Sequence, residues 1–165
     1  MDTTDDDINK LDFTDIINAS NREKNINDNI QKAIDEIPET LTSVNMLYIP
    51  STINEVELKL FVDTGAQISV MSLEKAFILG LEDLIDYNHQ GMVHGVGKQE
   101  IIGKIHFTEL QLNDFVMGCS FTIIPEQEDI ILGLDMLIAH GMKIDLEKRC
   151  LVLCNTEIPF CEKTT

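Results

Sequence analysis

The sequence predicts a mainly β fold, a small barrel preceded by a short helical appendage. Three observations lead to this prediction. Segments rich in β-forming residues recur between residues 41 and 154, separated by turn residues. Apolar residues at helical spacing are most regular before residue 40. The chain has 165 residues, enough for one domain with a sizeable core, and about eight strands suit a closed or partly closed barrel.

Three segments are expected along the chain. Residues 1–40 form an acidic tail and a short helical segment, residues 41–154 form the β domain, and residues 155–165 form a C-terminal tail. The start, MDTTDDD, offers little to bury and is expected to fray. The C-terminal tail carries Pro159 and little periodicity, which leaves its path open.

The N-terminal segment is predicted to contain one or two helices docked on another element. In NINDNIQKAIDEIPET, one helical face is apolar and Pro38 ends the helix. The residues of that face are Ile26, Ile30, Ala33, Ile34 and Ile37. A weaker helical pattern precedes it at Ile8, Leu11, Ile16 and Ile17.

The first half of the β domain alternates strands with one short helix. VNMLYIP and EVELKLFV are predicted strands, and STINE is their hairpin connection, although it lacks the glycine of a strong turn signal. In SLEKAFILGL, Ser72 is the predicted N-cap of a helix of about two turns, and Gly80 stops it.

The second half continues with β-rich segments. GMVHGVGKQEIIGKIHFTELQL and FVMGCSFTII are separated by Asn113-Asp114, and the glycine-rich part of the first is expected to be a hairpin tip. Next, an apolar strand ends at Gly133, a short helix runs through Ala139 and Gly141 stops it. Two final strands flank the turn EKR.

Charge and composition exclude several partners. Lys and Arg number 12 against 29 Asp and Glu, a formal net charge of -17, so the surface repels nucleic-acid phosphates and anionic lipid. The sequence has no apolar run of the roughly 20 residues that span a bilayer, and no secretory signal pattern at its start. We therefore expect a soluble protein of the cytoplasm, with the nucleus as a further location, that binds neither nucleic acid nor membrane.

The cysteines do not form a recognisable metal or redox motif. Cys119, Cys150, Cys154 and Cys161 include no CxxC pair and have no histidine at zinc-ligand spacing. Free thiols in a reducing compartment are the expected state. No cofactor and no metal ion are expected.

The stretch LKLFVDTGAQISVMS places Asp63 directly after an apolar strand, where a buried charge is costly. Thr64 and Gly65 then make a tight turn in which the carboxylate can face a cleft and another backbone can approach closely. The tripeptide is a weak signal by itself, because Asp63 could equally be an ordinary turn residue or an Asx cap.

The order of segments around this tripeptide resembles the retropepsin-like aspartic proteases. FVDTGAQISVMS lies roughly seventy residues before DIILGLDML, with the glycine-rich hairpin HGVGKQEIIG between them. NINDNIQKAIDEIPE, VNMLYI, GVGKQEIIGKIH, CSFTI and NTEIPF extend the resemblance to the DNA-damage-inducible protein family, which is ubiquitin-linked and retroviral-protease-like. The resemblance implies a small retropepsin-like acid-protease barrel with one active-site half per chain.

The resemblance also implies a catalytic site at Asp63. With one D-[ST]-G per chain, a catalytic pair needs a homodimer in which two Asp63 carboxylates share a proton and activate a water molecule. Thr64 would brace the two loops, Gly65 would permit their approach, and Ala66 would leave space for substrate.

A flap is implied by the same resemblance. Its residues are His94, Gly95, Val96 and Gly97, whose backbone would bind an extended substrate by strand addition. These glycines are alternatively a flexible surface turn, and His94 a solvated loop histidine. Another set of residues lines either the substrate pockets or the core: Val62, Ile68, Val93, Ile131 and Leu132. Asp135 is interpreted as a polar residue early in a helix.

The function implied is an aspartic endopeptidase acting on ubiquitinated or unfolded proteins in the ubiquitin-proteasome pathway. The alternative is a weakly active or inactive dimeric peptide-binding or scaffold module of that pathway. A third hypothesis is a monomeric β-barrel with an accidental Asp-Thr-Gly. The ubiquitin-like and ubiquitin-associated domains of many relatives do not fit into this sequence, which we expect to be a complete short version of the family. Thr64 stands where relatives often have Ser.

Overall fold

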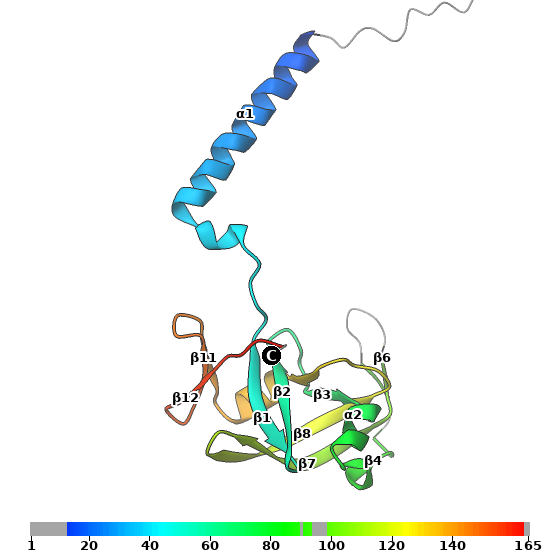
Figure 1. The fold of residues 1–165 in the computed structure, drawn as a ribbon. Coiled ribbons are helices and arrows are strands. Elements are labelled where there is room, and N and C mark those ends of the chain that lie inside the picture. Colours follow the sequence, from blue (N-terminus) through cyan, green and yellow to red (C-terminus); the bar gives the residue numbers. More distant parts are fainter. Residues whose placement is uncertain (1–12, 90, 94–98, 164–165) are drawn as a thin grey trace, which may run out of the picture. The chain divides into compact units, whose positions relative to one another are not determined.

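The computed structural model describes residues 13–89, 91–93 and 99–163 of the chain. The chain divides into two compact units, Met1–Val44 and Asn45–Thr165 (Figure 1). The first unit contains one long helix, α1 (Phe13–Glu36), and a 3-10 turn, η1 (Pro38–Leu41). No residue of α1 is buried within this unit, and the docking that the sequence predicted stays a prediction.

The predicted N-terminal helix is present and longer than its strongest pattern. The weaker pattern at Ile16 and Ile17 belongs to the same helix, while Ile8 and Leu11 lie outside the described residues. The last turn closes with a 2.9 Å hydrogen bond from the Ile37 N–H to the Ala33 carbonyl. Pro38 follows and cannot donate to continue the helix, which explains where α1 ends.

The second unit is built on a closed ring of six strands. In the order of the ring these are β1 (Tyr48–Ile53), β2 (Val56–Val62), β9 (Ile130–Leu132), β3 (Val70–Ser72), β8 (Phe115–Ile124) and β7 (Gly103–Leu112). Pairing of β1 with β7 closes the ring, and β4 (Ile85–Asp86) is added to the edge of β7. Closure pairs the strand edges within the barrel, and it confirms the predicted small β-barrel.

Two parallel pairings stand out among antiparallel neighbours. β2 runs parallel to β9 and β3 parallel to β8, whereas the hairpins β1–β2 and β7–β8 are antiparallel. In the first parallel pair, Val62 lies opposite Leu132. The ends of β2 and β9 therefore lie side by side, although about 70 residues separate them in the chain.

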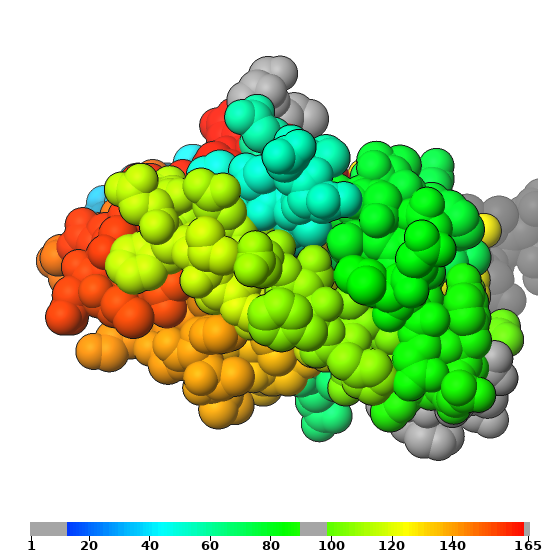
Figure 2. Space-filling view, turned by 90° about the horizontal axis from the view of Figure 1, so that it is seen from below, coloured from blue at the N-terminus to red at the C-terminus, as the bar shows by residue number. Residues whose placement is uncertain are grey.

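The β1–β2 hairpin turns tighter than predicted. Its turn is only Asn54 and Glu55, with φ of 48° and 65°, and β1 continues through most of the STINE segment. Positive φ at both turn residues gives the strands the right-handed twist of a two-residue hairpin. In Figure 2 the cyan β1–β2 hairpin lies between the green segment around the second helix and the yellow-green β7–β8 hairpin.

The two short helices of the second unit confirm their predicted signals. They are α2 (Leu73–Ile78) and α3 (Leu134–Ala139), and a 3-10 turn, η2 (Glu82–Leu84), follows α2. Ser72 caps α2, because its hydroxyl accepts a 3.1 Å hydrogen bond from the Lys75 N–H. Gly80 and Gly141 follow the two helices at φ of 66° and 59°, the left-handed conformation that ends a helix.

Two smaller sheets complete the unit. One is the hairpin of β5 (Gly91–Val93) and β6 (Gln99–Ile101). The other has three antiparallel strands, β10 (Lys143–Asp145), β11 (Cys150–Leu153) and β12 (Thr156–Pro159).

Strand β12 falls in the segment that the sequence predicted to be a C-terminal tail from residue 155. The turn before it, Cys154 and Asn155, again has positive φ without glycine, at 48° and 64°. Ile158 is fully buried in the same core as Leu151 of β11. This part of the chain is therefore an integral strand, which the weak turn signal did not reveal.

One core fills the barrel and extends under β11 and β12. Its largest fully buried side chains come from every strand of the ring and include Ile49, Leu60, Met71, Phe121 and Leu132. Among the described residues, none of the helices is long and apolar enough to cross a membrane.

The β1–β2 turn yields a first prediction. Glu55→Gly should raise the free energy of unfolding by roughly 0.5–1 kcal/mol, because glycine adopts φ of 65° without the Cβ penalty that Glu55 carries. Urea denaturation of the whole chain measures the effect.

The matched control is Glu57→Gly, two residues further along and also exposed, but in the extended strand β2. There glycine should lower stability by about 0.5–1 kcal/mol. Equal effects of the two substitutions would contradict the turn conformation.

Candidate active site

Asp63 lies immediately after β2, at the point where that strand runs beside β9. Its backbone N–H donates a 3.1 Å hydrogen bond to the Leu132 carbonyl, which extends the parallel pairing by one residue. The preceding residue, Val62, donates to the Leu47 carbonyl at 2.8 Å. The backbone of Asp63 is thus fixed from both sides of the strand while its side chain is only half-buried.

The residues after Asp63 form a tight turn that uses one of its carboxylate oxygens. The Gly65 N–H donates a 2.8 Å hydrogen bond to Asp63 Oδ1, and the Ala66 N–H donates to the Asp63 carbonyl at 3.2 Å. This is an Asx-type turn, the local structure that the sequence left open as an alternative. It sets the direction of the carboxylate and leaves the second oxygen, Oδ2, outside the turn.

Gly65 lies close to the Asp63 carboxylate. A Cβ at this position would lie 3.1 Å from Asp63 Oδ1, tighter than an ordinary contact. Thr64 and Gly65 are exposed and Ala66 is half-buried, so the tip of the turn is on the surface of the single chain. The cost of burying the Asp63 charge is therefore small in one chain.

A second segment holds the Asp63 turn from behind. The Leu134 N–H donates to the Ala66 carbonyl at 2.8 Å, and the Asp135 N–H donates to the Gln67 carbonyl at 3.1 Å. These donors are the first residues of α3, whose N–H groups have no partner within the helix. The start of α3 and the Asp63 turn therefore satisfy each other's backbone groups.

Gly133 makes this contact sterically possible. A Cβ there would lie 2.6 Å from the Ile68 carbonyl oxygen and 2.8 Å from that of Ala66, distances that backbone atoms cannot tolerate. The ILG segment therefore packs directly against the backbone of the Asp63 turn.

The side chains of Ser69 and Asp135 also connect the Asp63 turn to the start of α3, and the sequence analysis did not single out Ser69. The Ser69 hydroxyl donates a 2.7 Å hydrogen bond to Asp135 Oδ1 and accepts one of 2.9 Å from the Gly133 N–H. The Ser69 N–H donates to Asp135 Oδ2 at 3.0 Å. Asp135 lies in the first turn of α3, as predicted, and also binds Ser69 through both oxygens. The only sequence feature that could have pointed to Ser69 was its position, a hydroxyl residue six places after Asp63.

The predicted substrate-binding residues fall into three groups. His94, Gly95, Val96 and Gly97 lie outside the described residues, between β5 and β6. Val62 and Leu132 are buried in the core at 3% and 0% exposure, which answers the question that the sequence left open for them. Ile68 and Ile131 are half-buried, and of Val93 only the backbone in β5 is described.

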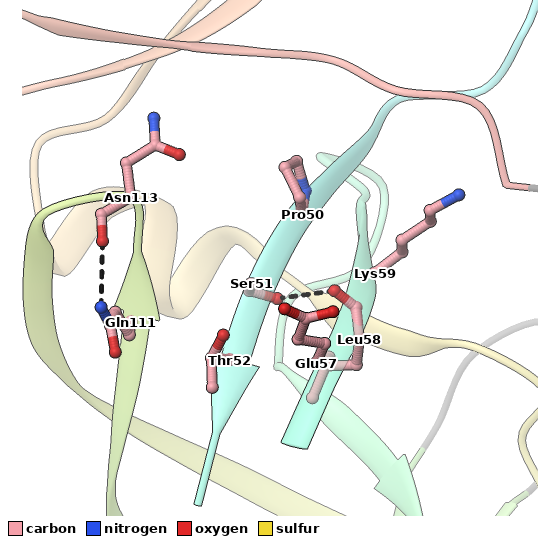
Figure 3. A pocket seen from close by; sticks show the side chains of 8 residues that line it. All are labelled: Pro50, Ser51, Thr52, Glu57, Leu58, Lys59, Gln111 and Asn113. Atoms are coloured by element: carbon pink, nitrogen blue, oxygen red, sulfur yellow. Dashed lines mark hydrogen bonds between the residues drawn. The ribbon is translucent and has the colours of Figure 1, made fainter. Parts of the chain in front are cut away.

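Two hollows in the described part of the chain lie away from Asp63. One lies over β1, β2 and the end of β7 (Figure 3), and its lining is mostly polar: Pro50, Ser51, Thr52, Glu57, Leu58, Lys59, Gln111 and Asn113. Another lies between the β1–β2 hairpin and α2 and includes Tyr48 and Lys163. Neither of these two hollows is lined by Asp63.

The structure gives less support to a nucleophilic cysteine or a metal ion as the reactive group near Asp63. Cys119 is buried, and burial together with the negative charge of Asp135 raises the pKa of its thiol to about 12. A thiol in that state is neutral at pH 7 and is not a nucleophile. In the described part of the chain, the one group of three metal-ligating side chains does not include Asp63.

Comparisons with known proteins agree with this geometry. The model of a family described as aspartyl protease matches residues 38–145. The chain is 40% identical over 144 residues to DNA damage-inducible protein 1 of Phaeosphaeria nodorum and 41% identical over 145 residues to Protein DDI1 homolog of Leishmania major. These alignments cover 87% of this chain but only 33% and 37% of the relatives, so the chain spans little more than a third of their length.

A solved structure matches the fold. The crystal structure of the retroviral protease-like domain of Ddi1 from Leishmania major superimposes with a TM-score of 0.68 at 44% sequence identity. The match covers 74% of this chain and 98% of that domain. The second unit therefore has the fold of that domain, in agreement with the fold class that the sequence predicted.

The junction between Ser69 and Asp135 yields a second prediction. Asp135→Asn should lower the free energy of unfolding by about 1–3 kcal/mol, because an amide group replaces one of two acceptor oxygens and leaves a half-buried donor facing another donor. Urea denaturation measures the loss. The control Glu126→Gln makes the same chemical change on an exposed loop side chain and should alter stability by less than about 0.5 kcal/mol. Equal stabilities of the two variants would contradict a structural role for Asp135.

The thiols yield a third prediction. In the folded protein at pH 8, iodoacetamide should modify exposed Cys154 and leave Cys119 unmodified, since Cys119 is both buried and neutral. Peptide mass spectrometry measures the extent at each position over time. In urea both thiols should react at similar rates. Labelling of Cys119 as fast as Cys154 in the folded chain would contradict its burial.

Proposed function

The chain belongs to the aspartyl protease family, to its Ddi-type, retropepsin-like group, and from this membership we propose that it is a homodimeric aspartic endopeptidase. The observation that carries the proposal is the Asp63 turn: one carboxylate, fixed at the end of β2 and presented on an exposed surface loop. The proposed site consists of two such turns, one from each chain, related by a two-fold axis.

A pair of carboxylates is needed because the reaction needs an acid and a base together. Two carboxylates a few ångström apart cannot both be ionised easily, so they share a proton. The ionised partner removes a proton from a water molecule, and the protonated partner donates to the carbonyl oxygen of the peptide bond. Water attacks the carbonyl carbon directly, and no side chain becomes covalently attached to the substrate.

The geometry of the turn suits this mechanism. The Gly65 N–H holds Oδ1 of Asp63 at 2.8 Å, which orients the carboxylate and leaves Oδ2 to the reaction. Thr64 is exposed at the tip, where its hydroxyl can bind the matching loop of a second chain. The start of α3 holds the turn through the Ala66 and Gln67 carbonyls, so the acid is supported by a rigid element instead of a free loop.

We propose extended polypeptides as substrates. The β5–β6 hairpin has its ends paired from Gly91 with Ile101 to Val93 with Gln99, and a hairpin that covers a catalytic pair can bind a substrate strand through its backbone. His94, Gly95, Val96 and Gly97 are the proposed contact residues of that hairpin. Unfolded or ubiquitinated proteins are the proposed source of such strands, in line with the resemblance to the DNA-damage-inducible family.

The fourth prediction tests the catalytic pair. Asp63→Asn should reduce cleavage of a denatured protein mixture near pH 5 by at least about a hundredfold, because the variant lacks both the base and the shared proton. New peptide ends identified by mass spectrometry measure the cleavage. Glu126→Gln is the control for the loss of one carboxylate at the surface and should keep full activity. Thr64→Ser should also keep activity, since it preserves the hydroxyl.

Mixing the two proteins tests whether the site needs two chains. After equimolar wild-type and Asp63→Asn chains exchange subunits, about a quarter of the dimers have two Asp63 residues, so activity per wild-type chain should fall to about half. Unchanged activity per wild-type chain would reject a shared site. If wild type and variant both match buffer while sedimentation shows a dimer, the peptide-binding scaffold of the ubiquitin-proteasome pathway becomes the favoured function. A monomer at micromolar concentration would reject the homodimer.

A further inference from the structure

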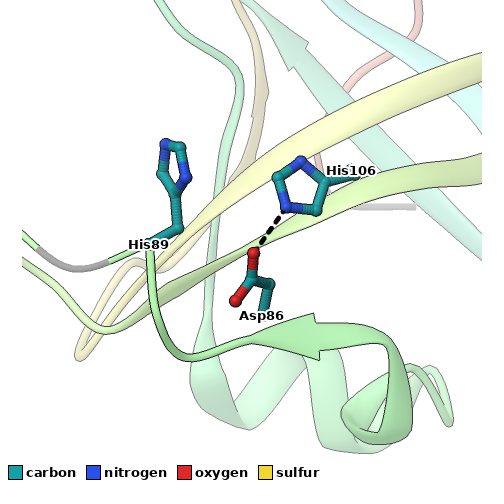
Figure 4. Close-up of side chains that lie close together, drawn as sticks. All are labelled: Asp86, His89 and His106. Carbon is teal, nitrogen blue, oxygen red and sulfur yellow. Dashed lines mark hydrogen bonds and ion pairs between the residues drawn. The ribbon is translucent and has the colours of Figure 1, made fainter.

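Three side chains with metal-binding atoms gather where β4 meets β7. Asp86 ends β4, His106 lies in β7, and His89 follows in the turn after β4 (Figure 4). One ligand atom from each of the three lies within 4.8 Å of the others. His106 Nε2 is 2.8 Å from Asp86 Oδ2, and the two imidazole rings are 5.6 Å apart, centroid to centroid, at an interplanar angle of 88°.

The backbone places these groups on one face. β4 and β7 pair in antiparallel register, Ile85 with Ile105 and Asp86 with Lys104. Ile85 and Ile105 point into the core, so Asp86 and His106, each one position further along its strand, point outward. The result is a diagonal pair across the two strands.

His89 is brought back to this face by a turn. The Asn88 N–H donates a 2.9 Å hydrogen bond to Asp86 Oδ1, and the His89 N–H donates to the Asp86 carbonyl at 3.3 Å. An Asp side chain that accepts from the N–H two residues later makes a compact turn. The cluster is therefore held by local hydrogen bonds on one side and by strand pairing on the other.

An irregularity in β7 exposes Phe107 next to His106. The register between β7 and β8 shifts between Ile105 and Thr108, so β7 carries one extra residue there. Such a bulge redirects side chains, and both His106 and Phe107 are exposed, whereas neighbours in a regular strand would alternate. His106 itself follows buried Ile105 and faces Asp86 and His89.

Two imidazoles and one carboxylate form a donor set for a transition metal. Zinc binds histidine nitrogen and carboxylate oxygen at about 2.0–2.2 Å, which places neighbouring ligand atoms roughly 3.3 Å apart in a tetrahedron. Side-chain rotations can bring atoms that lie within 4.8 Å to that spacing. Calcium and magnesium prefer oxygen ligands alone and fit this set less well. The net charge of -17 favours a cation.

We propose that Asp86, His89 and His106 bind one Zn²⁺ ion per chain, with the fourth position open to water. No metal was expected from the sequence, because the cysteines form no zinc motif; Asp86, His89 and His106 were not considered as ligands. The site is separate from Asp63, and the proposal holds whether or not the chain is a peptidase.

An ion bound at this position would connect the two ends of the β5–β6 hairpin. His89 lies two residues before β5, and His106 lies in the strand that follows β6, so the two histidines come from the two roots of the β5–β6 hairpin. At the same place Gly103 packs against the backbone of Asp86, where a Cβ would lie 2.8 Å from its carbonyl oxygen. A bound ion therefore joins both roots of the hairpin and should stabilise the folded chain.

The fifth prediction is tested by calorimetric titration of the whole chain with zinc chloride, with reductant present and no chelating buffer. We expect one ion per chain. His89→Gln and His106→Gln should each weaken the affinity by about tenfold or more, since loss even of an outer hydrogen bond around zinc costs that much. The matched control, Asp83→Asn, removes a carboxylate from an exposed residue three positions before Asp86 and should leave the affinity unchanged.

Exposed thiols are the competing zinc ligands, and a second variant separates them. Cys154→Ser should keep the affinity of the wild type. Cobalt bound at the proposed site should show no sulfur-to-metal charge-transfer band, because none of the ligands is a thiolate. Zinc should raise the melting temperature of the wild type and not that of the double variant His89→Gln, His106→Gln. Melting without metal checks that this variant is folded.

Two outcomes overturn the proposal. Zinc affinity that survives in the folded double histidine variant would place the ion elsewhere. Affinity that disappears in Cys154→Ser, together with a charge-transfer band from cobalt, would assign the binding to the thiols. Cleavage by the Asp63 pair is read separately with metal-free protein, so failure of the zinc site and failure of the proposed peptidase are distinguishable.

Discussion

The parallel pairing of β2 with β9 is the interaction on which the candidate site depends. It places the Asp63 turn beside Gly133, and the first N–H groups of α3 then bind the carbonyls of that turn. Neither segment could be satisfied alone, because a helix start has free donors and a tight turn has free acceptors. Ser69 and Asp135 complete the junction with three further hydrogen bonds, counting the one from Gly133. The acid of the site is thus attached to the core of the barrel through backbone and side chains together.

The same junction explains how a charge can follow a buried strand. Val62 is in the core, but Asp63 is half-buried and the next two residues are exposed, so the carboxylate remains at the surface of the single chain. Under the proposed function, a second chain would cover this surface and supply the other carboxylate. The expensive burial would then occur only in the dimer, where the shared proton lowers the charge to be buried. One chain by itself would provide Asp63 and its turn, but neither the second carboxylate nor the buried surroundings of the pair.

The cluster of Asp86, His89 and His106 is built in a different way, at the junction of β4 and β7. There the bulge in β7 sends two consecutive side chains outward, and the Asp86 turn returns the chain to the same face. Both features lie at the roots of the β5–β6 hairpin. A bulge costs one ladder pairing, and it changes the direction of a side chain without changing the strand that carries it. In the proposed zinc site, His106 lies next to ligands that come from the neighbouring strand β4 and from the turn that follows it.

Interactions between residues close in the sequence were sufficient to predict many of the local structures of this protein. The cap at Ser72, the glycines that end α2 and α3, and the acid that follows β2 act through neighbours a few residues away, and each was predicted. Family motifs extended this to the barrel, which the structural match supports. The sequence did not indicate β12, whose turn lacks glycine, or the pairing of Ser69 with Asp135 across 66 residues. Both features depend on which strands are neighbours in the sheet. The closed barrel decides which strands are neighbours, because strands far apart in sequence are stabilised by contacts with each other and not by residues within one short segment.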